Sequence, residues 1–159
     1  MPENTPKTKI NAVKGYGAKV TFCEPTQEAR ERTIARIVEE TGATFIHPYN
    51  DYRIICGQAT CAKELIEHTE KLHYIIAPVS GGGLLSGTAL SANYFGSNIR
   101  VIAAEPKGAD DAYRSLRDNK IYPSINPQTI ADGLRTSLCP KTFEIIKKHV
   151  SEILTEIFA

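Results

Sequence analysis

Three consecutive glycines lie at the centre of the segment APVSGGGLLSG, residues 77–87, directly after an apolar run. Glycine in regular structure costs about 0.5–1 kcal/mol relative to alanine, and a tight turn alone would need only one. Where a strand meets a helix, glycines let the backbone approach an anion, and the helix N-terminus offers unpaired N–H groups. The sequence therefore predicts that Gly81, Gly82 and Gly83 bind a phosphate group; the alternative is a turn without a ligand.

A dinucleotide is one ligand that would carry such a phosphate. Gly81 and Gly83, followed by Ser86, approximate the GxGxxG/A fingerprint of dinucleotide-binding loops. Glu105 ends the next apolar run, where an acidic residue would bind an adenosine ribose. The segment departs from this fingerprint in two ways. Serine replaces the third glycine, and the loop lies in the middle of the chain, after two expected strand–helix units.

The elements that must position this loop alternate between strands and helices. Thr5 is the expected N-cap of a first helix, with Pro6 at its first position, and Thr26 is the expected N-cap of a second. Because strands alternate with long helices, we expect an α/β fold with a parallel sheet covered on both faces. The predicted strands are residues 18–22, 43–47, 73–79, 98–105 and 151–155, and the predicted helices are 6–17, 26–42, 52–69, 84–95 and 140–150, with a short helix inside 107–120.

Composition excludes several functional classes. The net charge is +1, with 19 basic and 18 acidic residues interspersed, which argues against nucleic acid or a membrane surface as partner. No apolar stretch approaches the roughly 18–20 residues that span a bilayer, and the N-terminal residues lack a signal-peptide core. The four cysteines form no CxxC pair, so we expect free thiols in a cytoplasmic protein.

Five ordered segments together resemble the serine/threonine dehydratase and serine racemase family of pyridoxal-phosphate enzymes. That resemblance implies open parallel sheets with flanking helices, as parts of two domains of the fold-type II enzymes. Residues 1–47 would be the second half of the small domain, and residues 48–159 the first half of the large, phosphate-binding domain. The segments are MPENTPKTKINAVKGYGAKVTF, IHPYNDYRIICGQAT, APVSGGGLLSG, VIAAEPKGADDAY and TIADGLRTS.

The resemblance also implies two sets of site residues. The cofactor set comprises a phosphate loop and two positions that border the pocket, namely Ser80, Gly81, Gly82, Gly83, Leu84, Tyr49 and Gly133. Family members that hold a divalent cation use the positions matching Glu105, the Ala109 carbonyl and Asp111. Such oxygen ligands suit Mg²⁺ or Ca²⁺; the alternative is an ordinary solvated acidic loop.

Three parts of the family pattern have no match here. These are the phenylalanine–lysine–x–arginine–glycine segment with the lysine that bonds to the cofactor, the serine–x–asparagine loop and the C-terminal glycine-rich segment. We therefore expect a central fragment with no catalytic residue assigned, inactive alone, that binds pyridoxal phosphate weakly or through its phosphate only. Its partners would be the family's amino-acid substrate and a second copy or a complementary fragment. A non-catalytic anion- or dinucleotide-binding module remains the alternative.

Overall fold

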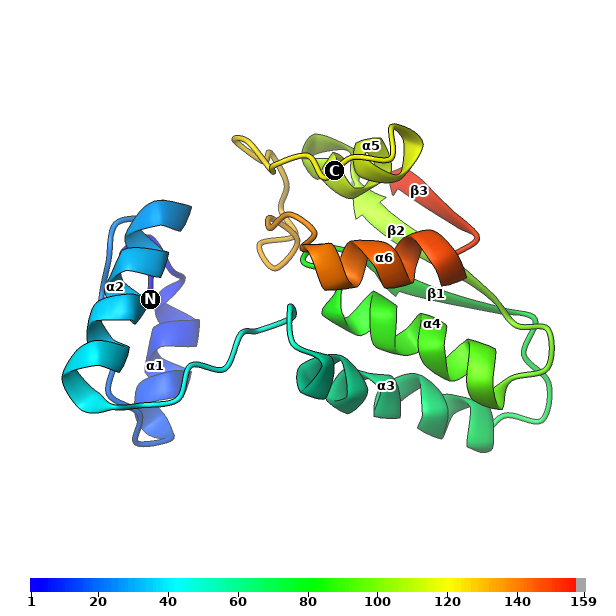
Figure 1. Cartoon of the computed structure of the whole chain (residues 1–159), viewed down its shortest axis with the longest axis horizontal. Coiled ribbons are helices and arrows are strands. Elements are labelled where there is room, and N and C mark those ends of the chain that lie inside the picture. The colour runs from blue at the N-terminus through cyan, green and yellow to red at the C-terminus, as the bar shows by residue number, and fades with distance from the viewer. Residues whose placement is uncertain (157–159) are drawn as a thin grey trace. The chain divides into compact units, whose positions relative to one another are not determined.

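The computed structural model describes residues 1–156, which form an α/β protein with a parallel sheet and six α-helices among these residues (Figure 1). The chain divides into two compact units between Ile46 and His47. No helix within the described residues is long and apolar enough to cross a membrane.

The first unit contains α1 (Lys7–Gly15) and α2 (Gln27–Thr41). The predicted cap of α2 is confirmed, because Thr26 Oγ1 accepts a hydrogen bond from the Ala29 backbone N–H at 3.1 Å. The predicted cap of α1 is wrong. Thr5 Oγ1 donates instead to the Pro2 carbonyl at 2.7 Å, which removes the hydroxyl from the helix N-terminus and leaves Pro6 at the cap position.

The strands predicted at residues 18–22 and 43–47 are wrong for this structure. The first unit contains one isolated parallel bridge among the described residues, between Pro2 and Cys23, and residues 43–47 form no strand. A strand is defined by hydrogen bonds to a neighbour, and β-propensity alone does not supply one. In the second of these segments the apolar side chain of Ile46 is 63% exposed.

The second unit is built on a three-stranded parallel sheet in the order β1-β2-β3. Its strands are β1 (Tyr74–Pro78), β2 (Arg100–Pro106) and β3 (Glu152–Glu156). Ala77 lies opposite Ala103, and Ala103 lies opposite Ile153. The three strands predicted in this part of the sequence are therefore confirmed.

Helices in the second unit follow the prediction within a few residues. They are α3 (Tyr52–Glu67), α4 (Gly83–Phe95), α5 (Asp111–Arg117) and α6 (Pro140–His149), with a 3₁₀ turn at Lys107–Ala109. Helix α4 packs against β1, β2, α3 and α6, as Figure 1 shows. The close approach of α3 and α4 requires a glycine, since a Cβ on Gly87 would lie 2.5 Å from the Ala59 backbone nitrogen.

The sheet is buried on one face and partly exposed on the other. Ala77, Ala103 and Ile153 belong to the core that includes side chains of α4 and α6. Alternate residues point to the opposite face, where Ile76 is 65% exposed and Leu154 is 42% exposed. The expectation of a sheet covered on both faces is therefore wrong for the described residues.

Candidate functional site

The glycine loop lies where β1 ends and α4 begins, at the carboxyl end of a parallel strand. Ligands of open α/β sheets bind at this edge. Gly82 is the N-cap of α4 and has φ +88°, a left-handed conformation that glycine adopts without strain. Because α4 is a regular helix of 13 residues, its first N–H groups and the positive end of its dipole face the loop.

Each of the three glycines is also required by packing. A Cβ on Gly81 would lie 2.5 Å from the ring of Tyr49, and one on Gly83 would lie 2.9 Å from the Tyr49 Cβ. On the other side of the loop, a Cβ on Gly82 would lie 2.8 Å from side-chain atoms of Leu138 and Ile146. The premise that a turn here needs only one glycine is therefore wrong, because the loop is enclosed between Tyr49 and the α6 region.

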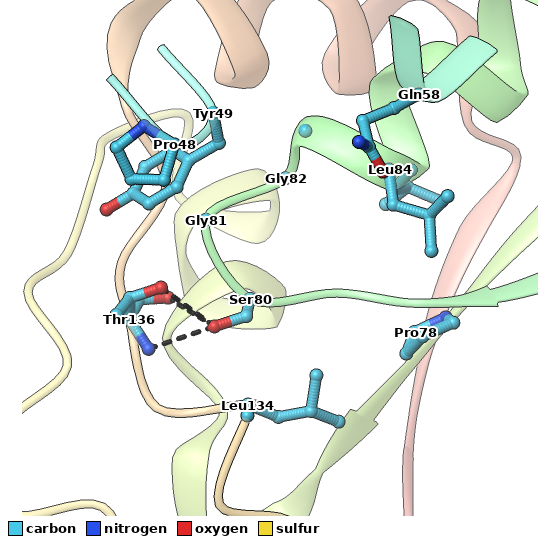
Figure 2. A pocket seen from close by; sticks show the side chains of 13 residues that line it. Pro48, Tyr49, Gln58, Pro78, Ser80, Gly81, Gly82, Leu84, Leu134 and Thr136 are labelled. Atoms are coloured by element: carbon cyan, nitrogen blue, oxygen red, sulfur yellow. Dashed lines mark hydrogen bonds between the residues drawn. The ribbon is translucent and has the colours of Figure 1, made fainter. Parts of the chain in front are cut away.

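Two hydroxyl side chains hold the loop from distant parts of the chain. Ser80 Oγ accepts a hydrogen bond from the Thr136 backbone N–H at 2.9 Å and lies 2.9 Å from Thr136 Oγ1, as the dashed lines in Figure 2 show. Thr142 Oγ1 donates to the Gly81 carbonyl at 2.8 Å. The loop is thus hydrogen-bonded to residues that lie 56 and 61 positions later in the chain.

A cavity of about 290 Å³ opens beside the loop (Figure 2). It brings together every residue that the sequence assigns to the cofactor. These are Tyr49, Ser80, Gly81, Gly82, Gly83, Leu84 and Gly133. The structure thus places all seven at one cavity, while their contact with a cofactor stays a prediction.

The sequence reasoning missed six further residues that line the cavity. They are Pro48, Gln58, Pro78, Leu85, Leu134 and Thr136. Of these, Thr136 is the one that holds the loop through Ser80. Thr136 could have been predicted to line the cavity, because it lies three residues after Gly133 in the segment TIADGLRTS.

The lining of the cavity carries neither an amino nor a carboxyl side chain. None of the described residues accepts a hydrogen bond from the backbone N–H groups of Gly81, Gly82 or Gly83. Backbone N–H groups at a helix N-terminus are well suited to bind phosphate. The site can therefore bind and orient an anion, and its lining holds no amine that could bond covalently to an aldehyde.

A second group of polar residues lies where β2 meets α5. Glu105 is 1% exposed, and its two carboxylate oxygens accept hydrogen bonds from the Ala112 and Tyr113 backbone N–H groups, each at 2.8 Å. Burial raises the pKa of Glu105 to about 7, against the opposing effect of these hydrogen bonds. Glu105 is therefore a buried acceptor at the start of α5.

Asp111 is the second carboxylate of this group. It is 3% exposed, and its Oδ2 makes no hydrogen bond of acceptable geometry to the described residues. The Ser124 side chain, whose hydroxyl is likewise unpaired, lies close enough to act against the rise in the Asp111 pKa. Burial is the main reason why its pKa rises to about 6. A buried carboxylate oxygen without a partner is costly, so the chemistry of this group fits a bound cation.

The predicted cation set thus contains two carboxylates and the carbonyl of Ala109, which is a buried residue in the 3₁₀ turn. Among residues 1–156, no three histidine, cysteine, aspartate or glutamate side chains are grouped in a way that could hold a metal ion. The alternative of a solvated acidic loop does not describe Glu105 and Asp111, because both are buried. Binding of Mg²⁺ or Ca²⁺ stays a prediction.

Comparison with known families identifies the fold that holds this loop. Residues 1–156 match the family described as "Pyridoxal-phosphate dependent enzyme". The chain belongs to the pyridoxal-phosphate-dependent enzyme family. This membership favours the cofactor interpretation of the glycine loop over the dinucleotide interpretation, whose proposed ribose ligand, Glu105, is buried against α5.

Relatives within the family are similar over nearly the whole of this chain. A beta-hydroxyaspartate dehydratase of Paracoccus denitrificans is 48% identical over 98% of the chain and 49% of its own length. A serine racemase of Dictyostelium discoideum is 47% identical over 97% of the chain and 48% of its own length. The chain therefore spans about half the length of the curated relatives it matches.

Solved structures of fold-type II pyridoxal-phosphate enzymes superpose on the same region. Maize serine racemase matches with a TM-score of 0.95 and 42% identity, over 98% of this chain and 47% of its own. The T.th. threonine deaminase matches with a TM-score of 0.89 and 40% identity, over 98% of this chain and 52% of its own. The predicted family and fold class are thereby confirmed.

Proposed function

We propose that this chain is the phosphate-binding half of a pyridoxal-phosphate-dependent enzyme that acts on a 2-amino-3-hydroxy acid, as a dehydratase (ammonia-lyase) or a racemase. The observation that carries the proposal is the cavity that collects all seven predicted cofactor residues beside unpaired N–H groups of the glycine loop. The substrate class is supported by the relatives, since serine, threonine and beta-hydroxyaspartate, which appear in their names, all carry a hydroxyl on the carbon next to Cα.

Pyridoxal phosphate, when bound, supplies the electron sink that stabilises negative charge at the substrate Cα. The residues of this chain bind and orient the group. Gly81, Gly82 and Gly83 offer backbone N–H groups to the phosphate, and Ser80 holds the loop in place through Thr136. Tyr49 and Gly133 border the space in which the rest of the cofactor would lie.

The same cavity supports the proposal that the chain is inactive alone. Proton transfer at Cα and covalent attachment of the cofactor both require an amine of lowered pKa, and the lining contains none. The amine is proposed to come from the half of the family fold that residues 1–159 do not contain. Without it, the glycine loop would bind pyridoxal phosphate weakly, through the phosphate.

The uncovered face of the sheet is the proposed contact with that missing half. Tyr74, Ile76 and Leu154 are 53%, 65% and 42% exposed on this face. Large apolar side chains are expected to be covered in a parallel sheet. Since the chain spans about half of its relatives, the complementary half is the occupant that we propose, and self-association is the competing outcome.

We further propose that Glu105, the Ala109 carbonyl and Asp111 hold a divalent cation. The buried, unpartnered Oδ2 of Asp111 supports this assignment, and oxygen ligands favour Mg²⁺ or Ca²⁺. The four free cysteines among the described residues support a cytoplasmic location.

Equilibrium dialysis of the purified chain with pyridoxal phosphate, inorganic phosphate and NAD tests the proposed site. We expect pyridoxal phosphate and inorganic phosphate to compete for one site, and NAD to leave both unaffected. Binding of NAD with no competition from phosphate would contradict the proposal. Borohydride reduction followed by peptide mapping tests the missing amine, and stoichiometric labelling of a single lysine would show that this chain supplies it.

Catalysis is tested separately with serine and threonine. We expect the chain to form 2-oxo acid no faster than free pyridoxal phosphate does, because binding of the phosphate without the amine does not lower the barrier to proton removal. A faster rate that is lost on changing the glycine loop would show that the chain is active alone.

A further inference from the structure

Thr142 is a buried polar residue in the first turn of α6 that no sequence motif singles out. Its side chain is fully buried, and its Oγ1 lies 2.8 Å from the Gly81 carbonyl oxygen and 3.0 Å from the Cys139 carbonyl oxygen. The same oxygen accepts a hydrogen bond from the Cys139 backbone N–H at 3.1 Å. One hydroxyl proton must therefore be assigned to one of two carbonyls.

The surroundings of the two carbonyls assign the proton to Gly81. The Cys139 carbonyl already accepts a hydrogen bond from the Phe143 backbone N–H at 2.8 Å. The Gly81 carbonyl receives no other hydrogen bond from the described residues. A buried carbonyl without a donor is costly, so the Thr142 hydroxyl donates to Gly81.

That bond sets the direction of the next N–H group in the loop. No peptide bond of the described residues is cis, and in a planar trans peptide the N–H points opposite to the C=O. Since the Gly81 carbonyl points to Thr142, the Gly82 N–H points away from α6. The cavity is lined by Gly82 and by no residue of α6, and Figure 2 shows Gly81 and Gly82 on the loop that borders it.

We propose that Thr142 is a positioning residue that directs the Gly82 N–H toward a bound phosphate through its bond to the Gly81 carbonyl. This role rests on the proposed phosphate site. Thr142 does not line the cavity, so it acts only through the orientation of one peptide group. The hydroxyl, rather than the shape of the side chain, is the feature that the role requires.

Amide NMR of the ¹⁵N-labelled chain, titrated with inorganic phosphate, tests the proposal on Thr142→Val, which keeps the shape, and Thr142→Ser, which keeps the hydroxyl. A hydrogen bond to a charged group contributes about 1.5–3 kcal/mol, so we expect phosphate binding to weaken by roughly tenfold or more in Thr142→Val. In that variant the Gly82 amide signal should no longer respond to phosphate. Thr142→Ser should bind within about twofold of the unaltered chain, with the Gly82 response intact.

Two outcomes would overturn the role of Thr142, and they differ from failure of the site. If Thr142→Val binds phosphate as the unaltered chain does and Gly82 still responds, the peptide is not held by the hydroxyl. If Thr142→Ser is as weak as Thr142→Val while both fold, the shape of the side chain matters and the hydroxyl does not. Absence of any phosphate response in the unaltered chain would overturn the phosphate site itself, and the role of Thr142 with it.

Thr142→Val also removes the acceptor of the Cys139 N–H, so its folding must be checked by thermal unfolding. If it does not fold, Thr142→Cys takes its place, because a thiol is a weak donor of similar size. That variant should bind phosphate more weakly than Thr142→Ser. Equal binding by Thr142→Cys and Thr142→Ser would overturn the proposal.

Discussion

The Cα of Gly81 lies so close to the ring of Tyr49 that an added Cβ would be 2.5 Å from the ring atoms Cδ1 and Cε1. This contact joins the glycine loop to the segment that precedes α3, and both residues line the cavity. It means that the backbone of the loop, rather than a side chain, must form this part of the cavity wall.

Gly81→Ala should therefore destabilise the chain and weaken phosphate binding together. Forcing a methyl group into a packed contact costs about 1–3 kcal/mol, and the loop must move to relieve it. Gly57→Ala is the matched control, since a Cβ at Gly57 meets no atom within 4 Å. Urea unfolding and phosphate dialysis measure the two effects, and equal behaviour of the two variants would show that the contact with Tyr49 is unimportant.

Addition of Mg²⁺ or Ca²⁺ should raise the melting temperature of the chain. A ligand at 100 times its dissociation constant stabilises the folded state by about 2.7 kcal/mol, and the unpartnered Oδ2 of Asp111 is the proposed ligand. Asp111→Asn should remove the response, while Asp118→Asn, at the exposed end of α5, should keep it. A chelator-treated sample gives the baseline, and no cation response in the unaltered chain would contradict the assignment.

The stability contributed by Asp51 should disappear in acid. The hydrogen bond from the Arg53 side chain, together with that from the Arg53 backbone N–H, lowers the pKa of Asp51 from 3.8 to about 2. Because the folded-state pKa is the lower one, the stabilisation is complete above pH 3.8 and is lost as the pH falls toward 2. Urea unfolding of the unaltered chain and of Asp51→Asn between about pH 7 and pH 2.5 measures this loss. The difference between their free energies of unfolding should shrink as the pH falls, and a difference that stays constant would be inconsistent with the pKa shift.

When the complementary half is absent, self-association is the way left to cover the open face of the sheet, and Ile76→Lys should reduce that self-association at micromolar concentration. Ile76 is 65% exposed on the open face of the sheet, and a lysine there places charge in the proposed contact. Tyr94→Lys is the control, because Tyr94 is 74% exposed and belongs to α4 rather than to a strand. Light scattering and dye binding measure the result. If the unaltered chain is a monomer that binds no apolar dye, the open face of the sheet does not require a partner, and the proposed contact is wrong.

Much of the second unit could be predicted because its signals are local. The apolar runs that became β1, β2 and β3 and the glycines at the start of α4 are contiguous in the sequence. In the first unit the same holds for the cap at Thr26, whose partner is the Ala29 N–H three residues away. Ordered motifs added the family and the seven residues that meet at the cavity.

The missing strands and the exposed sheet face could not be read from the sequence. Segments 18–22 and 43–47 have strand-like composition, yet pairing requires a neighbouring strand, and the described residues provide only the bridge at Cys23. In the same way, an apolar run such as β1 indicates burial but not what covers each face. Ile76 is 65% exposed because burial depends on tertiary contacts, and among the described residues no element covers its side chain.

By itself, then, the sequence determined the order of the elements in the second unit, the family and the position of the glycine loop between β1 and α4. Only the tertiary structure decided how that loop is held. The bond from Thr142 to Gly81 spans 61 residues and that from Thr136 to Ser80 spans 56, and nothing in the spacing of these residues predicts either pair. A hydrogen bond depends on the distance and direction between two groups in space, and folding, not the local sequence, brings residues so far apart in the chain to within 2.8 and 2.9 Å of each other.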